Sequence, residues 1–472
     1  MMTIDTHDQV APAASRRATA LRERCGDTVT IPGEAAFDEL RTPWNVAADL
    51  RPAAVASPRT AEEVRDIVRA AVDLGLRVAP QSTGHAGAIL AQHDLSDVVL
   101  LRTTALTSVV VDPDRRVARI GGGATWQRVV EAAAEHGLAA QHGSSPDVGV
   151  AGYLLGGGLS WYARSKGLAV NDVLAVELVT ADGELVRAHA EQHQDLFWAV
   201  RGGGGNVGIA TAVELRLHPI TDAYAGLFLW DLAQLEPVLR HWVTWTATAP
   251  EEITTALRVM RFPPLPDLPP FLSGRSVVVV DGVVLGDDEA GSDLVAGFRA
   301  LAPELDTWAR TPAAALTRLH MDPEGPTPSV GSGTLVTDLD EDGIAAFVEA
   351  VGPDARTSLL MAELRQLGGA VGRPVPGGGV LSRLDAAYVA FFVAIAPTAE
   401  AARVGRLDAE RARRALAAWE TGQSFLNLVE RPVDPRSGYG HDAWVRLTEV
   451  RRRVDPDGVF LAGHEVPVGR RS

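Results

Sequence analysis

The chain has 472 residues, 46% of them hydrophobic and 22% charged, which indicates a folded protein of two or three domains and excludes a disordered chain. Its formal net charge of −16 disfavours a nucleic-acid partner and an anionic membrane surface, because both need clustered lysine and arginine. Cys25 is the only cysteine, so an intramolecular disulfide and a thiolate metal cluster are excluded.

The N-terminal region is polar and alanine-rich, and residues 1–30 predict a mobile lead-in. No apolar segment follows Arg16 and Arg17, so we expect a cytoplasmic protein with neither an export signal nor a membrane span. The first regular helix is expected after Thr60, which can cap it, and should end at Gly75.

Three glycine-rich loops follow in the next part of the chain. The first spans residues 81–87, the second 143–158 and the third 201–208. Glycine lets backbone N–H groups approach a ligand closely, so such loops can hold phosphates or flat polar rings. One such loop is more often only a tight turn, but three loops flanked by predicted strands and helices favour a large bound cofactor.

The common nucleotide, metal and hydrolase motifs do not explain these loops. Gly203, Gly205 and Gly208 match the dinucleotide fingerprint, but that motif needs a strand before it and a helix after it, and here the order is reversed. The sequence contains no phosphate-binding P-loop, no H-E-x-x-H zinc motif and no G-x-S-x-G elbow for a nucleophilic serine. We therefore expect no metal site.

The region after Pro219 has a different character. Apolar strands are expected over residues 254–261, 276–285, 359–367 and 387–395, and helices over 232–246, 292–302 and 399–421. This alternation predicts a sheet covered on one face by helices.

The order of the loops resembles the FAD-linked oxidases of the berberine bridge enzyme type, in the vanillyl alcohol oxidase superfamily. The resemblance rests on PQSTGHAG (80–87), GSSPDVG (143–149), GYLLGGG (152–158) and DLFWAVRGGGGNVG (195–208). It continues in LGGA (367–370), RL (446–447) and VDPDGVF (454–460), and so covers about residues 45–465.

The resemblance implies an α+β fold with a bipartite PCMH-type FAD-binding domain and a substrate domain that has an antiparallel sheet covered by helices. The FAD domain would comprise residues 45–220 and be completed by residues 425–472, with the substrate domain at 221–424. It also implies that FAD is attached covalently through His85. The implied cofactor-binding residues are Gln81, Ser82, Thr83, Gly84, His85, Ala86, Gly87, Ser144, Ser145, Val148, Gly149, Gly152, Gly156, Gly208, Ile209 and Asn427.

The sequence departs from the family pattern at several positions. Many relatives have a second flavin link from a cysteine where this chain has Ser145, so a single link is expected. The family's catalytic tyrosine is replaced by Phe425, and an asparagine before the Arg-Leu pair is replaced by Ala443. Val148 stands where a valine in relatives accompanies reaction of the reduced flavin with oxygen, which favours an oxidase.

Replacement catalysts are sought on the central sheet. If residues 359–367 form a strand, Glu363 and Arg365 share one face and Gln366 lies on the other. Glu363 is then a candidate base, with a pKa either raised by burial or held down by Arg365. A surface ion pair of little consequence is the alternative. Tyr388 and His320 are further candidates.

These features predict an oxidase that takes a hydride from a small-molecule substrate onto flavin N5 and reduces molecular oxygen. The missing tyrosine favours the tailoring of a secondary metabolite over sugar oxidation. One alternative is a dehydrogenase with another electron acceptor. The other is a flavin-containing protein that sequesters an aromatic compound without turning it over.

Overall fold

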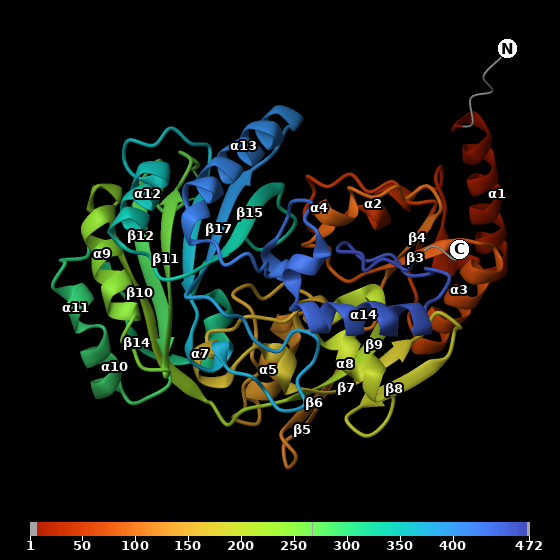
Figure 1. The fold of residues 1–472 in the computed structure, drawn as a ribbon, viewed down its shortest axis with the longest axis horizontal. Coiled ribbons are helices and arrows are strands. Elements are labelled where there is room, and N and C mark those ends of the chain that lie inside the picture. Colours follow the sequence, from red (N-terminus) through yellow and green to blue (C-terminus); the bar gives the residue numbers. More distant parts are fainter. Residues whose placement is uncertain (1–6, 267, 470–472) are drawn as a thin grey trace.

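The protein is described by a computed structural model over residues 7–266 and 268–469. Two sheets form one half of the molecule and a larger sheet with its helices forms the other (Figure 1). The first sheet has the strand order β1-β2-β4-β3, with β2, β4 and β3 parallel. Its strands are β1 (Val29–Thr30), β2 (Ala54–Ala56), β3 (Arg77–Gln81) and β4 (Val98–Arg102).

The helix expected after Thr60 is confirmed as α3 (Ala61–Asp73), which connects β2 to β3. The Thr60 hydroxyl accepts a hydrogen bond from the Glu63 backbone N–H at 3.1 Å, so it caps the helix as predicted. Val64, Ile67 and Val68 recur at helical spacing and are buried against the first sheet.

The predicted mobile lead-in covers residues 1–30, and residues 1–6 lie outside the described part of the chain. Within the rest, the structure has a helix, α1 (His7–Cys25), beside α3 (Figure 1). Ala18 and Leu21 are buried in the core of the first sheet. The Arg17 guanidinium donates to the Gly75 carbonyl at 2.7 Å, and Arg24 forms an exposed ion pair with Asp73. These apolar and polar contacts join the helix to the domain.

The second sheet is antiparallel, in the order β5-β6-β9-β7-β8. Its strands are β5 (Val109–Asp112), β6 (Val117–Gly121), β7 (Val173–Val179), β8 (Leu185–His189) and β9 (Ile209–Arg216). The helices of this region are α5 (Trp126–Ala134), α6 (Val150–Leu155), α7 (Ala163–Lys166) and α8 (Gln194–Gly203). The second and third glycine-rich loops adjoin α6 and α8, so this sheet supports both.

The third sheet has eight strands, and its pairings are antiparallel. They are β10 (Asp222–Asp231), β11 (Ile253–Arg261), β12 (Ser276–Val284), β13 (Leu305–Asp306), β14 (Ala309–Pro312), β15 (Ser329–Val336), β16 (Met361–Gln366) and β17 (Tyr388–Ile395). Helices cover one face, which confirms the predicted architecture: α9 (Leu235–Thr246), α10 (Asp288–Leu294), α11 (Ala296–Arg299), α12 (Glu341–Val351) and α13 (Ala399–Ala415) (Figure 1). The sequence did not predict β10 or β15.

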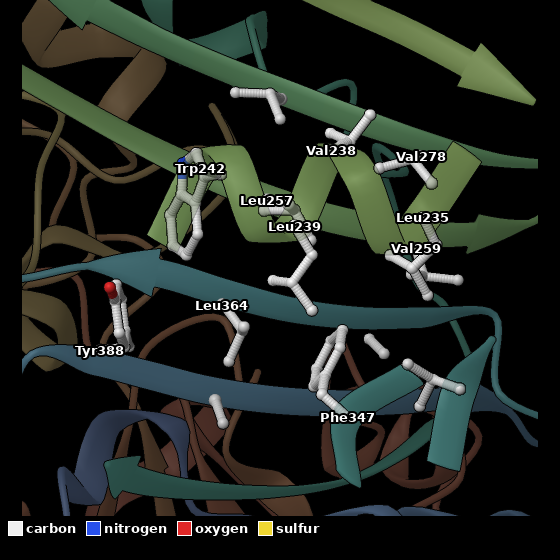
Figure 2. Packing of buried hydrophobic residues seen from close by; sticks show 14 of the residues in the cluster. Leu235, Val238, Leu239, Trp242, Leu257, Val259, Val278, Phe347, Leu364 and Tyr388 are labelled. Atoms are coloured by element: carbon white, nitrogen blue, oxygen red, sulfur yellow. The ribbon is translucent and has the colours of Figure 1, made fainter. Parts of the chain in front are cut away.

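The core of this half lies between the sheet and its helices. Leu257 and Leu364 point from the strands towards Leu239 of α9 and Phe347 of α12, with Trp242 close to Tyr388 (Figure 2). Each of these side chains is at most 2% exposed. Because side chains alternate along a strand, the residues between them face the opposite way, towards the other half of the molecule.

The C-terminal segment returns to the first half of the molecule. Helix α14 (His441–Val454) packs on α8 through Trp444 and Leu447. Beyond it, the Val78 N–H donates to the Val459 carbonyl at 2.7 Å, and the Leu461 N–H donates to the Val78 carbonyl at 2.9 Å. The tail thus pairs with the outer side of β3 and holds the strand that leads into the first loop.

Candidate active site

The first glycine-rich loop joins β3 to α4 (Gly87–Leu90). No hydrogen bond joins the five backbone N–H groups of residues 82–86 to the described part of the chain. Their carbonyls are used instead, since Thr83 and Gly84 accept from Trp44 and Asn45 N–H groups at 2.9 and 3.5 Å. A run of free, partly exposed amides can hold a pyrophosphate through hydrogen bonds.

Side chains at the base of this loop also lack partners. The Gln81 Oε1 and Ser82 Oγ atoms are buried without a hydrogen bond to a described residue. Gly84 has a φ of +93°, and a side chain there would clash with Pro43, so the turn needs glycine. Unsatisfied buried polar atoms are costly in a folded protein, and here they fit a polar ligand such as FAD.

The second loop lies against the first. The Gly149 N–H donates to Thr83 Oγ1 at 3.3 Å, and Ser144 and Ser145 donate their hydroxyls to Asp322 and Asp147, both at 2.8 Å. A side chain at Gly152 would meet no atom within 4 Å, so the chain is open to a ligand there. Val148 is half-buried between these positions.

The C-terminal segment reaches the same loop through Asn427. Its amide Nδ2 donates to the Tyr153 carbonyl at 2.9 Å, and its side chain occupies the space that a Cβ on Gly156 would need. Phe425, at the position of the family's tyrosine, is 3% exposed and its ring lies over Gly157. The structure therefore brings residues 425–427 to the second loop, as a bipartite domain requires.

The third loop contributes less directly. Gly208 precedes β9, and the side chain of Ile209 is buried in the core of the first sheet. Only the backbone of Ile209 is therefore free to meet a ligand. Ala443, in α14, packs at the margin of the core of the second sheet.

His85 is held on one side by an aromatic ring. Its imidazole stacks on Trp44 with the ring centroids 4.0 Å apart and an angle of 25° between the planes. Its Nε2 lies 3.5 Å from the Asp147 backbone carbonyl and 3.7 Å from the Asp147 carboxylate. Burial lowers the pKa of His85 more than Asp147 raises it, so the imidazole is neutral at neutral pH.

A cluster of buried charges lies on the face of the third sheet that turns away from the helices. Glu363 Oε1 accepts from Arg365 Nε at 2.8 Å and lies 3.4 Å from His320 Nε2. His320 Nδ1 is 2.8 Å from Asp281, which also pairs with Arg258 at 2.5 Å. All but Arg365 are at most 2% exposed, so the alternative of a surface ion pair is wrong.

The charges in this cluster determine its protonation. Burial raises the pKa of Glu363, but the Arg365 guanidinium and the His320 imidazole outweigh it and hold that pKa well below its usual range. Burial lowers the pKa of His320, but Asp281 and its other acidic neighbours raise it to about 9. Of the two predicted possibilities for Glu363, the structure supports the lowered pKa, so this carboxylate is ionised and a weak base.

Asp322 interacts both with the charge cluster and with the second glycine-rich loop. It accepts the Ser144 hydroxyl, and its charge raises the pKa of Arg365 and of His320 and counteracts the lowering of the His85 pKa. Farther along the chain, the Gly325 N–H donates to Asp147 at 2.9 Å and the Thr327 N–H to the Trp44 carbonyl at 3.1 Å. The segment 322–327, which follows His320 of the charge cluster, is therefore bonded to the residues beside His85.

Tyr388 and Gln366 lie elsewhere. They are paired across β16 and β17, and both face the helices. The Tyr388 hydroxyl is 2.7 Å from Thr246 Oγ1, and its ring packs on Trp242. Tyr388 is thus on the opposite face of the sheet from Glu363, and the structure does not support it as a catalytic residue.

The sequence analysis missed Trp44, Asp147, Arg258, Asp281 and Asp322. Asp147 was visible within the second loop, but no motif marks that position. The others are distant in sequence and meet only through the pairing of strands and the segment 320–327.

Within residues 7–266 and 268–469, no group of three or more histidine, cysteine or acidic residues is arranged to hold a metal ion. The same residues contain no helix long and apolar enough to cross a membrane.

Comparison with known proteins finds an FAD-binding domain in the chain. Residues 52–189 match the family described as FAD binding domain. An FAD-dependent monooxygenase of Penicillium roqueforti is 32% identical over 245 residues, which are 51% of this chain and 48% of that protein. The chain therefore contains an FAD-binding domain. It also shares 36% identity over 203 residues with (R)-6-hydroxynicotine oxidase of Paenarthrobacter nicotinovorans, covering 43% of this chain and 44% of that enzyme.

The matched region spans about half the length of these curated relatives. Solved structures extend the likeness to the whole fold. Berberine bridge enzyme-like 1 of Physcomitrella patens superimposes with a TM-score of 0.84 at 22% identity, over 96% of this chain and all of that one. 6-Hydroxy-D-nicotine oxidase of Arthrobacter nicotinovorans gives 0.78 at 24%, over 93% and 97%. The predicted PCMH-type two-domain fold is confirmed.

Proposed function

We propose that this FAD-linked oxidoreductase is an oxidase that carries FAD covalently on His85 and transfers a hydride from a small-molecule substrate to flavin N5. FAD supplies the redox chemistry when bound. One observation carries the proposal: His320, which lies 3.4 Å from Glu363, leads directly into segment 322–327, and that segment is hydrogen-bonded to Ser144, Asp147 and Trp44 beside His85. A flavin attached at His85 would have the buried Glu363–Arg365 pair within reach.

We assign the parts of FAD to residues of the glycine-rich loops. We assign the pyrophosphate to the free amides of residues 82–86, and the flavin edge to His85, Ser145 and Asp147. Asn427 and Gly156 would close the site from the C-terminal side. We propose that the substrate domain is bounded by the FAD-binding domain near residue 220 and by its C-terminal completing segment near residue 425.

Glu363 and Arg365 would act on the substrate. Only Nε of Arg365 is hydrogen-bonded to a described residue, so its two terminal amino groups can donate to a substrate oxygen. Ionised Glu363 is a weak base, and we assign it the stabilisation of the positive charge that develops on the substrate carbon as hydride leaves. His320 and Asp281 would hold Glu363 in place.

The substrate class follows from what is missing. Phe425 cannot accept a proton. In the buried charge cluster, Glu363 is ionised with a lowered pKa and His320 is protonated, so neither is an effective base at neutral pH while their ion pairs are intact. This disfavours simple sugar oxidation, although the relatives include xylooligosaccharide and glucooligosaccharide oxidases. We propose a tailoring reaction on a secondary metabolite in the cytoplasm, with molecular oxygen as electron acceptor.

Two alternatives remain specific enough to test. A dehydrogenase would have the same site but pass its electrons to another acceptor, and Val148 argues against it. A protein that sequesters an aromatic ligand would bind it tightly without bleaching the flavin. The buried charge cluster argues against this, because ion pairs are costly to bury in a site that only binds an apolar ring.

The test needs no known substrate. The purified protein is photoreduced without oxygen and then mixed with air while the flavin absorbance is followed. Fast return of the oxidised spectrum is expected, and the Val148→Leu variant should return more slowly with the same FAD content. Slow return in the wild type would favour the dehydrogenase, and a protein that binds no FAD would contradict the proposal.

A further inference from the structure

The carboxylate of Asp147 is the charged group next to His85. Asp147 lies in the second loop, two residues after Ser145, and its Oδ1 is 3.7 Å from His85 Nε2. Its backbone carbonyl is 3.5 Å from the same nitrogen. Both side chains are 26% exposed, and Asp147 lines a cavity of about 630 Å³ together with Trp44 and Thr83. A small molecule can therefore reach the pair.

Three donors fix this carboxylate. Trp44 Nε1 and the Gly325 N–H donate to Oδ2 at 2.6 and 2.9 Å, and the Ser145 hydroxyl donates to Oδ1 at 2.8 Å. Burial raises the pKa of Asp147, but these hydrogen bonds outweigh it and lower the pKa, so the group is ionised at neutral pH. The donors come from three separate segments of the chain, which makes the position of the carboxylate rigid.

This arrangement selects one tautomer of His85. A neutral imidazole has one N–H and one lone pair, and the hydrogen bond at one nitrogen decides the state of the other. Both acceptors of Asp147 face Nε2, so the proton belongs there and Nδ1 carries the lone pair. The stacked Trp44 ring holds the plane of the imidazole.

We propose that Asp147 is the positioning residue for covalent flavin attachment: it holds the Nε2–H of His85, so that Nδ1 forms the bond to the flavin 8α-carbon. The inference rests on the proposed function and deepens it, since it assigns both the residue that prepares the histidine and the atom that becomes linked. The carboxylate also stabilises the positive charge that the imidazole acquires as the bond forms.

The step balances as an oxidation of the two groups. One N–C bond forms, and one C–H bond of the 8α-methyl group and the Nε2–H bond release their protons. The two electrons remain on the flavin and then pass to molecular oxygen, which leaves as hydrogen peroxide with the two protons. Oxygen is the required oxidant, and the step uses no other reagent.

The test follows covalent attachment itself. Full-length protein made in a riboflavin-starved host is mixed with FAD in air, and the linked fraction is measured over time by acid precipitation and intact mass. Asp147→Asn should bind FAD yet link it about 100-fold more slowly, because an amide can present a donor to Nε2 and favour the wrong tautomer. Asp147→Glu should recover part of the rate.

The matched control is Glu39→Gln, which removes an exposed carboxylate from the wall of the same cavity and should link FAD at the wild-type rate. If Asp147→Asn fails to fold or to bind FAD, Asp147→Ala is assayed with and without formate. Faster linkage with formate supports the proposal, and no response contradicts it.

Failure of this inference is distinguishable from failure of the proposed function. Wild-type protein that never links FAD would contradict covalent attachment itself. Wild-type and Asp147→Asn proteins that link FAD equally fast would contradict only the role of Asp147. Peptide analysis that finds the flavin on Nε2 of His85 would also overturn the assigned tautomer.

Discussion

The two faces of the third sheet are built from alternate residues of the same strands, yet one face is apolar and the other carries buried charges. On β11, Leu257 points into the core under the helices, and the next residue, Arg258, points to the buried charge cluster. On β16, Leu364 lies between Glu363 and Arg365 in the same way. The helix face gains stability from apolar burial, whereas the site face buries charges that cost solvation and need their partners.

The largest expected effect comes from breaking a pair on the site face. Arg258→Met leaves Asp281 without its guanidinium, and we expect a loss of about 3–5 kcal/mol in the free energy of unfolding. The matched change is Leu257→Ala on the helix face of the same strand, with a loss of about 2–5 kcal/mol from the cavity. Denaturant unfolding measures both.

The rate of flavin reduction should distinguish the Leu257→Ala and Arg258→Met variants. The Leu257→Ala protein should keep its rate of flavin reduction, because its lost contacts lie under the helices. The Arg258→Met protein should lose it, because Asp281, and through it His320, is displaced. An Arg258→Met protein of unchanged stability and rate would contradict the division of the sheet into these faces.

A smaller effect is expected when one charge is neutralised without changing shape. Glu363→Gln should lower the rate of flavin reduction by about 100-fold, as loss of one electrostatic contact to a transition state does. Tyr388→Phe, on the opposite face, should change that rate less than about 2-fold and cost about 1 kcal/mol of stability through its lost hydrogen bond to Thr246. Stopped-flow absorbance with a substrate found by screening provides the rates, and equal effects in the two variants would refute the assignment.

The last expected effect is a gradual dependence of stability on pH. The pKa of His320 rises from 6.5 in the unfolded chain to about 9 in the fold, so its contribution is fully present below pH 6.5 and is lost as the pH rises through 9. We expect the free energy of unfolding to fall over that interval by at most about 3 kcal/mol. The His320→Gln protein, compared by denaturant titration, should lack this part of the decline; identical pH curves would show that His320 is not protonated in the fold.

The sequence predicted the face of Glu363 and Arg365, because alternation along a strand depends only on the strand being there. It offered Tyr388 as a candidate without assigning its face, because that face depends on the register of β16 with β17, which pairs it with Gln366. The loops of the FAD site were recognisable because each is continuous in sequence. Asp281 and Asp322 were not, since they reach the site only through strand pairing and the segment 320–327. Helix α1 was missed because Ala18 and Leu21 give little apolar signal in a polar segment.

The proposed function depends most directly on a covalent link between FAD and His85. The direct measurement is the visible spectrum of the purified protein, followed by acid precipitation of the wild type and of His85→Ala. We predict a yellow pellet for the wild type and a white pellet for the variant. A yellow supernatant over a white wild-type pellet would contradict the link to His85. A wild-type protein that stays colourless after reconstitution with FAD would contradict FAD binding itself.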